Sequence, residues 1–401
     1  MTQKTTSEDF GCRTPSGPAF PMAPKGSQDG CGCSGGSGPS CCGGPGQDDR
    51  SGPHEKPGYT LNGFVEDFAD TPAGSVPRVR TRLSACDLSR HAAARMGIAR
   101  SSHRVTPGLY CVGKAGAESP VLVTANYSLS FDALRKELSG IAAWILVLDT
   151  RGVNVWCAAG KKTFSTGEVV LQVQQTRLET VVSHKRLVLP QLGAVGVNAH
   201  AVKKGCGFEV LWGPVRAADI PAFLKNGMKC TRPMRRVRFS LLDRLVLIPV
   251  EVSIMARPAA IVALLLFLLS GIGPGVFSFS ASWHRGLMLV TSLALGILAG
   301  AVVTPALLPY IPGAAFSKKG ALTGIAAALA AVLLHAGTAT FAELFALAVV
   351  AAAFSSYLAM NFTGATPFTS PSGVEKEMRA ALPFQGGALL TALLVWIGAA
   401  F

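Results

Sequence analysis

The stretch AWILVLDTRGVNVWCAAGK, residues 143–161, contains a strand pattern followed directly by a helix pattern. Residues 143–148 are all apolar, which is typical of a strand buried on both faces. Polar residues and a glycine follow at 149–152 and indicate a turn. Asn154 is a natural helix N-cap, so residues 155–157 are predicted to form the first turn of a helix. The stretch therefore predicts a strand–turn–helix unit.

Apolar runs on either side of this unit have the same character. They are PVLVTAN (120–126), RLVLPQ (186–191) and FEVLWGP (208–214). Helical patterns alternate with them, one from Ser130 and one from Ala217. Strands that alternate with helices predict an α/β domain over residues 61–230, Rossmann-like, with a mostly parallel sheet and helices on both faces.

Ligands of such sheets bind beyond the carboxyl ends of the strands, where the loops converge. Four loops could converge here on one large cofactor. The candidate binding residues in the loops after the strands are Thr124, Asn126, Thr150, Gly152, Pro190, Gln191, Leu192, Gly193, Gly213 and Pro214. The candidates around the predicted N-cap are Asn154, Val155, Trp156, Cys157, Ala158, Ala159, Gly160 and Lys161.

Cys157 has no second Cys or His at metal-ligand spacing. Free backbone amides in a first helical turn favour a thiolate, and the small residues at 158–160 would let a wide flat ring lie against this turn. The residues alone leave a second interpretation open, in which Cys157 is a buried structural cysteine. They also leave open whether Trp156 packs in the core or contacts the ring, and whether Lys161 reaches the cofactor or solvent.

The C-terminal third is predicted to be a membrane domain. The chain has 401 residues, of which 49% are hydrophobic and only 15% charged, and its apolar excess is concentrated after residue 258. A basic linker at 231–257 precedes it. The uncharged stretches give five all-α spans near the length that crosses a bilayer, at about 259–279, 287–311, 320–340, 344–361 and 384–401.

Lysine and arginine near the span ends predict the orientation. They are concentrated in the linker, at Lys318 and Lys319, and at Lys376 and Arg379, and these loops all fall on one side. We therefore expect a multi-pass protein of the cytoplasmic membrane with its α/β domain in the cytoplasm. The net charge of +14 follows from this topology, and the sequence has no basic stripe interleaved with aromatics that would indicate nucleic-acid binding.

Residues 1–60 are rich in Gly, Ser and Pro and lack the apolar segment of a signal peptide. They contain four clustered cysteines, Cys31, Cys33, Cys41 and Cys42, whose spacing fits neither a zinc ribbon nor a ferredoxin. Close thiols chelate soft metals well. The segment is interpreted either as a plain flexible tail or as a tail that captures a soft metal ion.

Several motifs carry a resemblance to known proteins. The segments from Pro107 to Leu138, VLDTRGVNVWCAAGK, HKRLVLPQLGAVGV and FEVLWGPVRAADIPAFL resemble the corrinoid-binding domain of the corrinoid iron–sulfur protein large subunit of the acetyl-CoA pathway. The eight residues NVWCAAGK, followed by about five spans, are similar to the HgcA family, the corrinoid proteins of mercury methylation. This resemblance covers roughly residues 60–401.

The resemblance implies a cobalamin-type corrinoid held base-off, with Cys157 as the lower axial ligand of its cobalt. It also implies a ferredoxin-type iron–sulfur partner, HgcB-like, as reductant, Hg(II) as substrate, and methyltetrahydrofolate as methyl donor through a methyltransferase. The D-x-H-x-x-G motif of methionine-synthase-type corrinoid domains does not occur in the sequence. A histidine lower ligand of that kind is therefore not expected.

The chemistry is consistent with a thiolate ligand. Hg(II) is an electrophile, so the methyl group must leave cobalt as a carbanion equivalent or a radical, and a thiolate below the ring stabilises the oxidised cobalt left behind. Two other functions stay open: a methyl carrier of one-carbon metabolism with a different acceptor, and a membrane transporter whose α/β domain senses a ligand. The spans contain few charges and no evident matched pair of broken helices, which gives the transporter little support.

Overall fold

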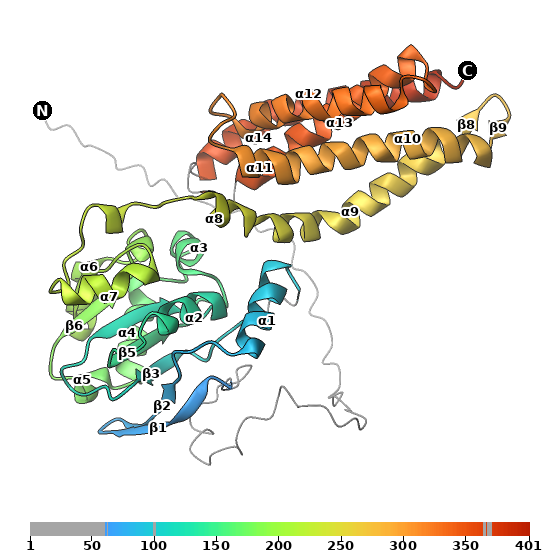
Figure 1. Cartoon of the computed structure of the whole chain (residues 1–401). Helices are drawn as coiled ribbons and strands as arrows, with labels where there is room; N and C mark the ends of the chain where they lie inside the picture. The colour runs from blue at the N-terminus through green and yellow to red at the C-terminus, as the bar shows by residue number, and fades with distance from the viewer. Residues whose placement is uncertain (1–60, 62, 99–101, 364–365, 367–370) are drawn as a thin grey trace, which may run out of the picture. The chain divides into compact units, whose positions relative to one another are not determined.

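The protein is described from a computed structural model that covers residues 61, 63–98, 102–363, 366 and 371–401 (Figure 1). The four clustered cysteines, Cys31, Cys33, Cys41 and Cys42, lie outside the described residues, so their metal-capture role stays a prediction. The α/β domain and the helical region that follows it are considered one after the other.

The α/β domain is built on a seven-stranded mixed sheet with the strand order β1-β2-β3-β5-β4-β6-β7. The strands are β1 (Val65–Thr71), β2 (Gly74–Val79), β3 (Gly108–Val112), β4 (Val121–Ala125), β5 (Ala143–Leu148), β6 (Arg186–Leu189) and β7 (Glu209–Trp212). The pairs β1–β2 and β3–β5 are antiparallel, and the pairs β2–β3, β4–β5, β4–β6 and β6–β7 are parallel.

The four predicted strands form the parallel half of this sheet, as β4, β5, β6 and β7. Their order, β5-β4-β6-β7, is that of a doubly wound sheet, and its topological switch point lies between β4 and β6. The sheet is mostly parallel, as predicted, and β1, β2 and β3 add its two antiparallel pairs, β1–β2 and β3–β5. These three strands were not predicted: β1 reads VEDFADT and has no apolar run, whereas β3 reads GLYCV and its apolar run was missed.

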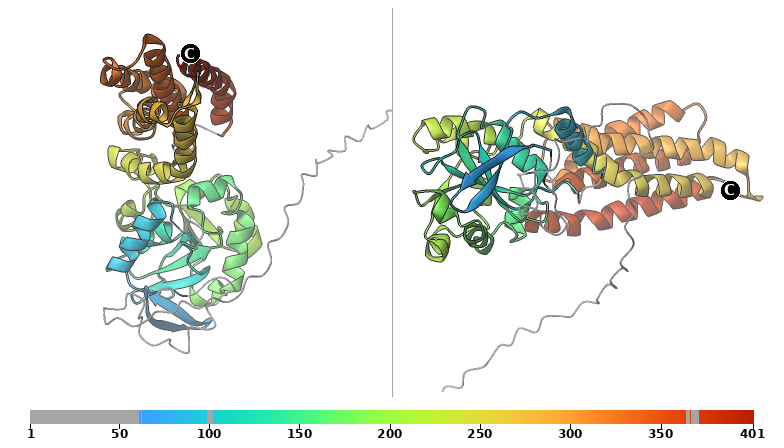
Figure 2. Two further views of the ribbon diagram at one scale, coloured as in Figure 1. Left: turned by 90° about the vertical axis from the view of Figure 1, so that its right-hand side faces the viewer. Right: turned by 90° about the horizontal axis from the view of Figure 1, so that it is seen from below.

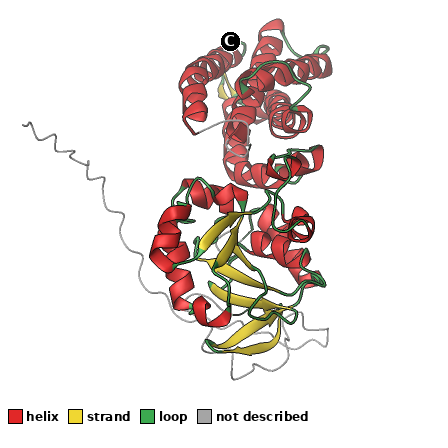
Figure 3. Cartoon of the chain, turned by 90° about the vertical axis from the view of Figure 1, so that its left-hand side faces the viewer, coloured by secondary structure: helices red, strands yellow, loops and turns green. Residues whose placement is uncertain are grey.

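Helices cover both faces of the sheet (Figure 3). On one face α2 (Ser128–Lys136) and α7 (Ile220–Lys225) pack with Leu122 of β4. On the other face α3 (Val155–Gly160), α4 (Thr166–Gln175), α5 (Leu178–Val181) and α6 (Ala199–Cys206) pack with Val121 and Val123 of the same strand. This alternation follows from the two-residue period of a strand. Short helical turns are η2 (Gln191–Gly193), η3 (Ala217–Asp219) and η4 (Pro233–Arg235).

A buried ionic cluster joins α1 (Ala85–Arg95) to α2. The Arg135 side chain is fully buried and donates to Asp132 at 2.7 Å, to Asp87 at 2.9 Å and to the carbonyl of Arg80 at 2.7 Å. His91 of α1 pairs with the second oxygen of Asp132 at 2.7 Å. Burial alone would raise the pKa of Asp87, but hydrogen bonds from Ser84 and the charge of Arg135 outweigh it and hold that pKa well below its ordinary value.

The helical region contains, within its described residues, five helices long and apolar enough to cross a membrane. Its elements are α8 (Leu241–Leu245), α9 (Ile248–Leu269), the hairpin β8 (Ile272–Gly273) and β9 (Val276–Phe277), α10 (Phe279–Leu298), the π-helical turn η5 (Ala299–Val303), α11 (Thr304–Leu307), α12 (Phe316–His335), α13 (Phe341–Phe362) and α14 (Pro371–Gly398). The first of these helices continues N-terminal to the predicted span, which was expected to begin at 259.

Glycines let these helices approach one another closely. On α12, a Cβ added at Gly320 would lie 2.4 Å from the Cβ of Ala359 on α13, and one at Gly324 would lie 2.8 Å from the Cα of Ala352. Helices α12 and α13 run alongside each other (Figures 1 and 2). Small residues at such crossings are typical of helix packing in membranes.

An ion pair between partly buried Arg285 and buried Glu343 also joins helices in this region. Arg285 of α10 donates to Glu343 of α13 at 2.7 Å, and its guanidinium lies 4.8 Å from the centre of the Trp396 ring of α14. It also donates to the carbonyl of Trp396. Arg285 and Glu343 lie just before the predicted spans 287–311 and 344–361, and their pairing was not predicted.

Candidate functional site

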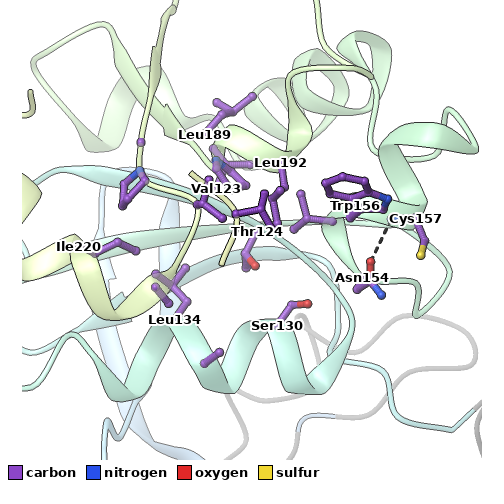
Figure 4. Close-up of a pocket in the computed structure, with 18 of the residues that line it drawn as sticks. Val123, Thr124, Ser130, Leu134, Asn154, Trp156, Cys157, Leu189, Leu192 and Ile220 are labelled. Atoms are coloured by element: carbon purple, nitrogen blue, oxygen red, sulfur yellow. Dashed lines mark hydrogen bonds between the residues drawn. The ribbon is translucent and has the colours of Figure 1, made fainter. Parts of the chain in front are cut away.

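A pocket opens at the carboxyl edge of the sheet, at the switch point between β4 and β6 (Figure 4). Ligands of doubly wound sheets bind at this position. Its lining within the α/β domain is Leu122, Val123, Thr124, Ser130, Ala133, Leu134, Asn154, Val155, Trp156, Cys157, Val188, Leu189, Pro190, Leu192, Gly213, Pro214, Val215, Ala217 and Ile220. The interior is apolar, around Leu134, Leu189 and Ile220, whereas polar groups gather toward α3.

Helix α3 presents Cys157 because of its N-cap. Asn154 has extended backbone, and its Oδ1 accepts a hydrogen bond from the Cys157 amide at 2.9 Å, as the sequence predicted. Val155, Ala158 and Ala159 are buried against the core, so Trp156 and Cys157 are turned outward. Cys157 is exposed, which is contrary to the alternative that it is a buried structural cysteine.

Figure 4 shows how the two outward side chains lie. The Trp156 ring lies toward Leu192 and Thr124, and the Cys157 sulfur lies at the rim, beside Asn154. Trp156 keeps 47% of its surface exposed, a large fraction for an indole that only packs in a core. Both side chains are therefore accessible to a ligand at the mouth of the pocket.

The loop after β6 packs against the end of α3. A Cβ at Gly196 would lie 2.1 Å from the carbonyl oxygen of Phe164, and one at Gly193 would lie 2.6 Å from the Phe164 ring. Gly193 thus supports this packing and does not line the pocket. Gln191, another predicted contact, does not line it either, and its Oε1 accepts a hydrogen bond from Arg235 at 2.9 Å.

The predicted contacts divide into two groups. Those that line the pocket are Thr124, Asn154, Val155, Trp156, Cys157, Pro190, Leu192, Gly213 and Pro214. Those that lie elsewhere are Asn126, Thr150, Gly152, Ala158, Ala159, Gly160, Lys161, Gln191 and Gly193. Asn126 and Thr150 are fully buried, and Thr150 donates hydrogen bonds to Asn126 Oδ1 through its amide and its hydroxyl. Corrinoid binding by the first group stays a prediction.

Sequence reasoning missed the contribution of α2. Ser130, Ala133 and Leu134 lie on one face of this helix and line the pocket. Their spacing of three and four residues is the signal that could have found them, since such residues share a helix face. Val215, Ala217 and Ile220, after β7, were also missed.

The thiol of Cys157 is an isolated donor. Among the described residues, no three His, Cys, Asp or Glu side chains gather to hold a metal ion. Of the five cysteines described, Cys157 is the exposed one, whereas burial raises the pKa values of Cys206 and Cys230.

The comparison with known families concerns this same domain. Residues 98–224 match the family model of the CO dehydrogenase/acetyl-CoA synthase delta subunit. The matched segment includes β3 to β7, α3 and most of the pocket lining listed above. It is narrower than the resemblance expected from the motifs, since the tail and the helical region lie outside it.

Curated relatives match over the same length of chain. The acetyl-CoA decarbonylase/synthase complex subunit gamma of Methanopyrus kandleri is 35% identical over 130 residues, 32% of this chain and 28% of that protein. The subunit gamma of Archaeoglobus fulgidus is 31% identical over 129 residues, 32% and 27% of the two chains. The corrinoid/iron-sulfur protein large subunit of Moorella thermoacetica is 31% identical over 127 residues, 31% and 28% of the two chains. The chain thus spans about a quarter of the length of these relatives.

Proposed function

We propose that the protein is a membrane-bound corrinoid protein of methyl transfer, in which the Cys157 thiolate is the lower axial ligand of cobalt. The observation that carries the proposal is the exposed Cys157 thiol at the rim of the switch-point pocket, in a part of the chain where the described residues form no cluster of three metal-ligating side chains. A corrin ring supplies four ligands in its own plane, so one protein donor suffices on one face. The relative from Moorella thermoacetica is named as the large subunit of a corrinoid/iron-sulfur protein, and this supports a corrinoid cofactor.

The residues around Cys157 fit such a group. Trp156 offers an exposed aromatic surface at the mouth of the pocket, and Thr124, Ser130 and Asn154 offer polar groups to the amide-bearing edge of the ring. The apolar interior would accept the nucleotide base that a base-off corrinoid releases. When bound, the corrinoid supplies a cobalt-bound methyl group. Cys157 would hold the cobalt through its sulfur, and the buried residues of α3 would keep the thiol in place.

The acceptor of the methyl group has two candidates. The relatives from Archaeoglobus fulgidus and Methanopyrus kandleri are named as gamma subunits of acetyl-CoA decarbonylase/synthase complexes. They support the first candidate, an acceptor of one-carbon metabolism. Hg(II) is the second candidate. Its support is the motif NVWCAAGK and the exposure of Cys157, because a thiolate below the ring favours transfer to an electrophile. In either case we propose a ferredoxin-type, HgcB-like iron–sulfur protein as reductant and a methyltetrahydrofolate-dependent methyltransferase as methyl source.

The experiment uses the full-length protein, purified in detergent and loaded with methylcobalamin. We expect one corrinoid per chain, and absence of binding would refute the proposal. Labelled methyl is then offered to Hg(II) and, separately, to a thiol nucleophile. Transfer to mercury that falls at least about 100-fold in Cys157→Ala supports the second acceptor. If methyl is transferred only to the thiol nucleophile, and Cys157→Ala transfers it as fast as wild type, the result supports a methyl carrier of one-carbon metabolism. That result would also refute the proposed role of the Cys157 thiol.

We further propose that the five apolar helices span the cytoplasmic membrane with the α/β domain in the cytoplasm. The support is the asymmetry of lysine and arginine between the loops on the two sides. A reporter that is active only in the cytoplasm should be active when fused after Lys319 and silent when fused after Phe401. The reverse pattern would refute this orientation.

A further inference from the structure

Asn126, at the end of β4, is fully buried and outside the pocket lining, although the sequence predicted it as a cofactor contact. Its Oδ1 accepts hydrogen bonds from the backbone amides of Thr150 at 3.0 Å and Gly152 at 2.9 Å, and the Thr150 hydroxyl lies 2.9 Å away. Its Nδ2 donates to Asp149 at 3.0 Å. Each polar atom of the side chain is thus bonded to the loop after β5.

The backbone of Asn126 is held just as firmly. Its amide donates to the carbonyl of Leu148 at 3.0 Å, and its carbonyl accepts from the amide of Val105 at 2.8 Å. The side chain therefore projects from a point fixed by β4, β5 and the segment before β3. A group with this support can hold a neighbouring loop without moving itself.

The loop that Asn126 binds has an unfavourable backbone. Arg151 has φ 58° and Gly152 has φ 74°, so two successive residues lie in the left-handed region. At Gly152, an added Cβ would lie 2.8 Å from Cγ of Arg104. Such a conformation persists where surrounding contacts stabilise it. The bonds from Asn126 to the amides of Thr150 and Gly152 supply that stabilisation on both sides of Arg151.

This loop determines where the thiol lies. Gly152 is followed two residues later by Asn154, which caps α3 and accepts the amide hydrogen of Cys157. We propose that Asn126 is a positioning residue: it fixes the strained turn at 149–152 and thereby the place at which Cys157 meets the pocket. The inference that Asn126 serves cofactor binding rests on the proposed function. The inference that Asn126 fixes the turn and α3 does not, because it rests on the hydrogen bonds of the chain itself.

The first test is amide hydrogen exchange in the full-length, corrinoid-free protein. Asn126→Ala leaves the amides of Thr150 and Gly152 without their acceptor, so we expect both to exchange at least about tenfold faster. Asn226→Ala is the matched control, because Asn226 bonds only locally, to the carbonyl of Lys229 at 2.9 Å. It should leave the loop unchanged. Wild-type exchange at 149–152 in Asn126→Ala would overturn the proposal.

A pair of variants keeps the test decisive if Asn126→Ala does not fold. Asn126→Asp keeps an oxygen that can accept from the amides of Thr150 and Gly152, but it places a second carboxylate against that of Asp149. Because the two charges repel each other, we expect faster amide exchange in the loop. Adding Asp149→Asn reverses the donor and the acceptor of this bond and should return exchange of the Thr150 and Gly152 amides to within about threefold of wild type. The Arg151 amide is left out of this comparison, because it donates to the same oxygen of Asp149 and loses that acceptor in the double variant. Failure of the Thr150 and Gly152 amides to recover protection would show that the bond does not hold the loop.

The second readout is the absorption spectrum of bound cobalamin. We expect Asn126→Ala to weaken corrinoid binding at least about tenfold and to lower the fraction with a protein ligand on cobalt, and the double variant to recover both. Unchanged binding and spectrum, despite a mobile loop, would overturn the link between Asn126 and Cys157. If wild type itself shows no sulfur ligand, the proposed function fails, whereas the exchange result still reports on Asn126.

Discussion

The α/β domain and the helical region use their buried polar groups differently. In the α/β domain, Asn126 and Thr150 hold the turn before α3, so the polar groups bear on the segment that presents Cys157. In the helical region, Arg285 and Glu343 join helix to helix, and glycines such as Gly320 bring backbones together. The polar contacts of Asn126 thus lie beside the proposed site, whereas those of Arg285 join helices to one another. Substitutions should therefore separate corrinoid binding from the stability of the helices.

The largest effect is expected at the ion pair of the helical region. Glu343→Ala leaves the partly buried Arg285 guanidinium with two carbonyls and the Trp396 ring but no carboxylate, and we expect a loss of about 3 kcal/mol of stability. Glu343→Gln keeps a hydrogen-bond acceptor and should lose less. Thermal unfolding in detergent measures both. Corrinoid affinity at the pocket should not change, and a large loss of affinity in either variant would break the proposed separation.

Gly320 tests the close helix contact. In Gly320→Ala the new methyl would meet both Ala359 and the carbonyl of Ser355, and we expect a loss of about 1–3 kcal/mol through overpacking. Gly386→Ala is the matched control on α14, because a Cβ there meets nothing within 4 Å. Equal unfolding temperatures for the two variants would contradict the packing described for α12 and α13.

Two asparagine N-caps sharpen the comparison within the α/β domain. Asn154 caps α3 at the pocket, and Asn198 caps α6 outside its lining, each by accepting one backbone amide hydrogen. Alanine at either position should cost about 1 kcal/mol of stability. Only Asn154→Ala should also weaken corrinoid binding, measured by titration with cobalamin. Similar binding by the two variants would show that the α3 cap does not serve the site.

The smallest effect is expected on the stability of the folded protein at low pH, through the carboxyl group of Asp87. The pKa of Asp87 lies well below its ordinary value of 3.8 in the folded protein, so the unfolded chain takes up the proton more readily. The stability that Asp87 contributes is complete above about pH 4 and is lost as the pH falls below it. Thermal unfolding between pH 6 and pH 3 should show this decline, and Asp87→Asn should flatten it. An unchanged slope in that variant would refute the assignment.

Much of the site could be predicted from the sequence, because its signals are local. The apolar runs of β4 to β7 and the cap at Asn154 depend on adjacent residues. The burial of Asn126 could not be read in this way. A polar residue that follows a strand resembles a ligand contact, and its burial depends on bonds to Val105 and Thr150, more than 20 residues away on either side. The face of α2 was missed for a different reason, since its spacing of three and four residues is a local signal that was not used.

Contacts between distant residues also determine the pairing of the hairpin β1–β2 and one ion pair of the helical region. The hairpin β1–β2 is amphipathic and carries charges, so its pairing depends on β3 and not on an apolar run of its own. The ion pair between Arg285 and Glu343 joins residues that are 58 positions apart. The sequence indicated that each lies near a span end, but their contact arises from the packing of α10 against α13.

The central claim is that Cys157 ligates the cobalt of a bound corrinoid. The most direct test is electron paramagnetic resonance of the full-length protein, loaded with corrinoid and reduced to the Co(II) state. A nitrogen ligand splits the cobalt lines through its nuclear spin, whereas sulfur does not. We predict no nitrogen splitting in wild type, a clear nitrogen triplet in Cys157→His, and a third spectrum, without an axial protein ligand, in Cys157→Ala. A nitrogen triplet in wild type, or identical spectra for wild type and Cys157→Ala, would contradict the account.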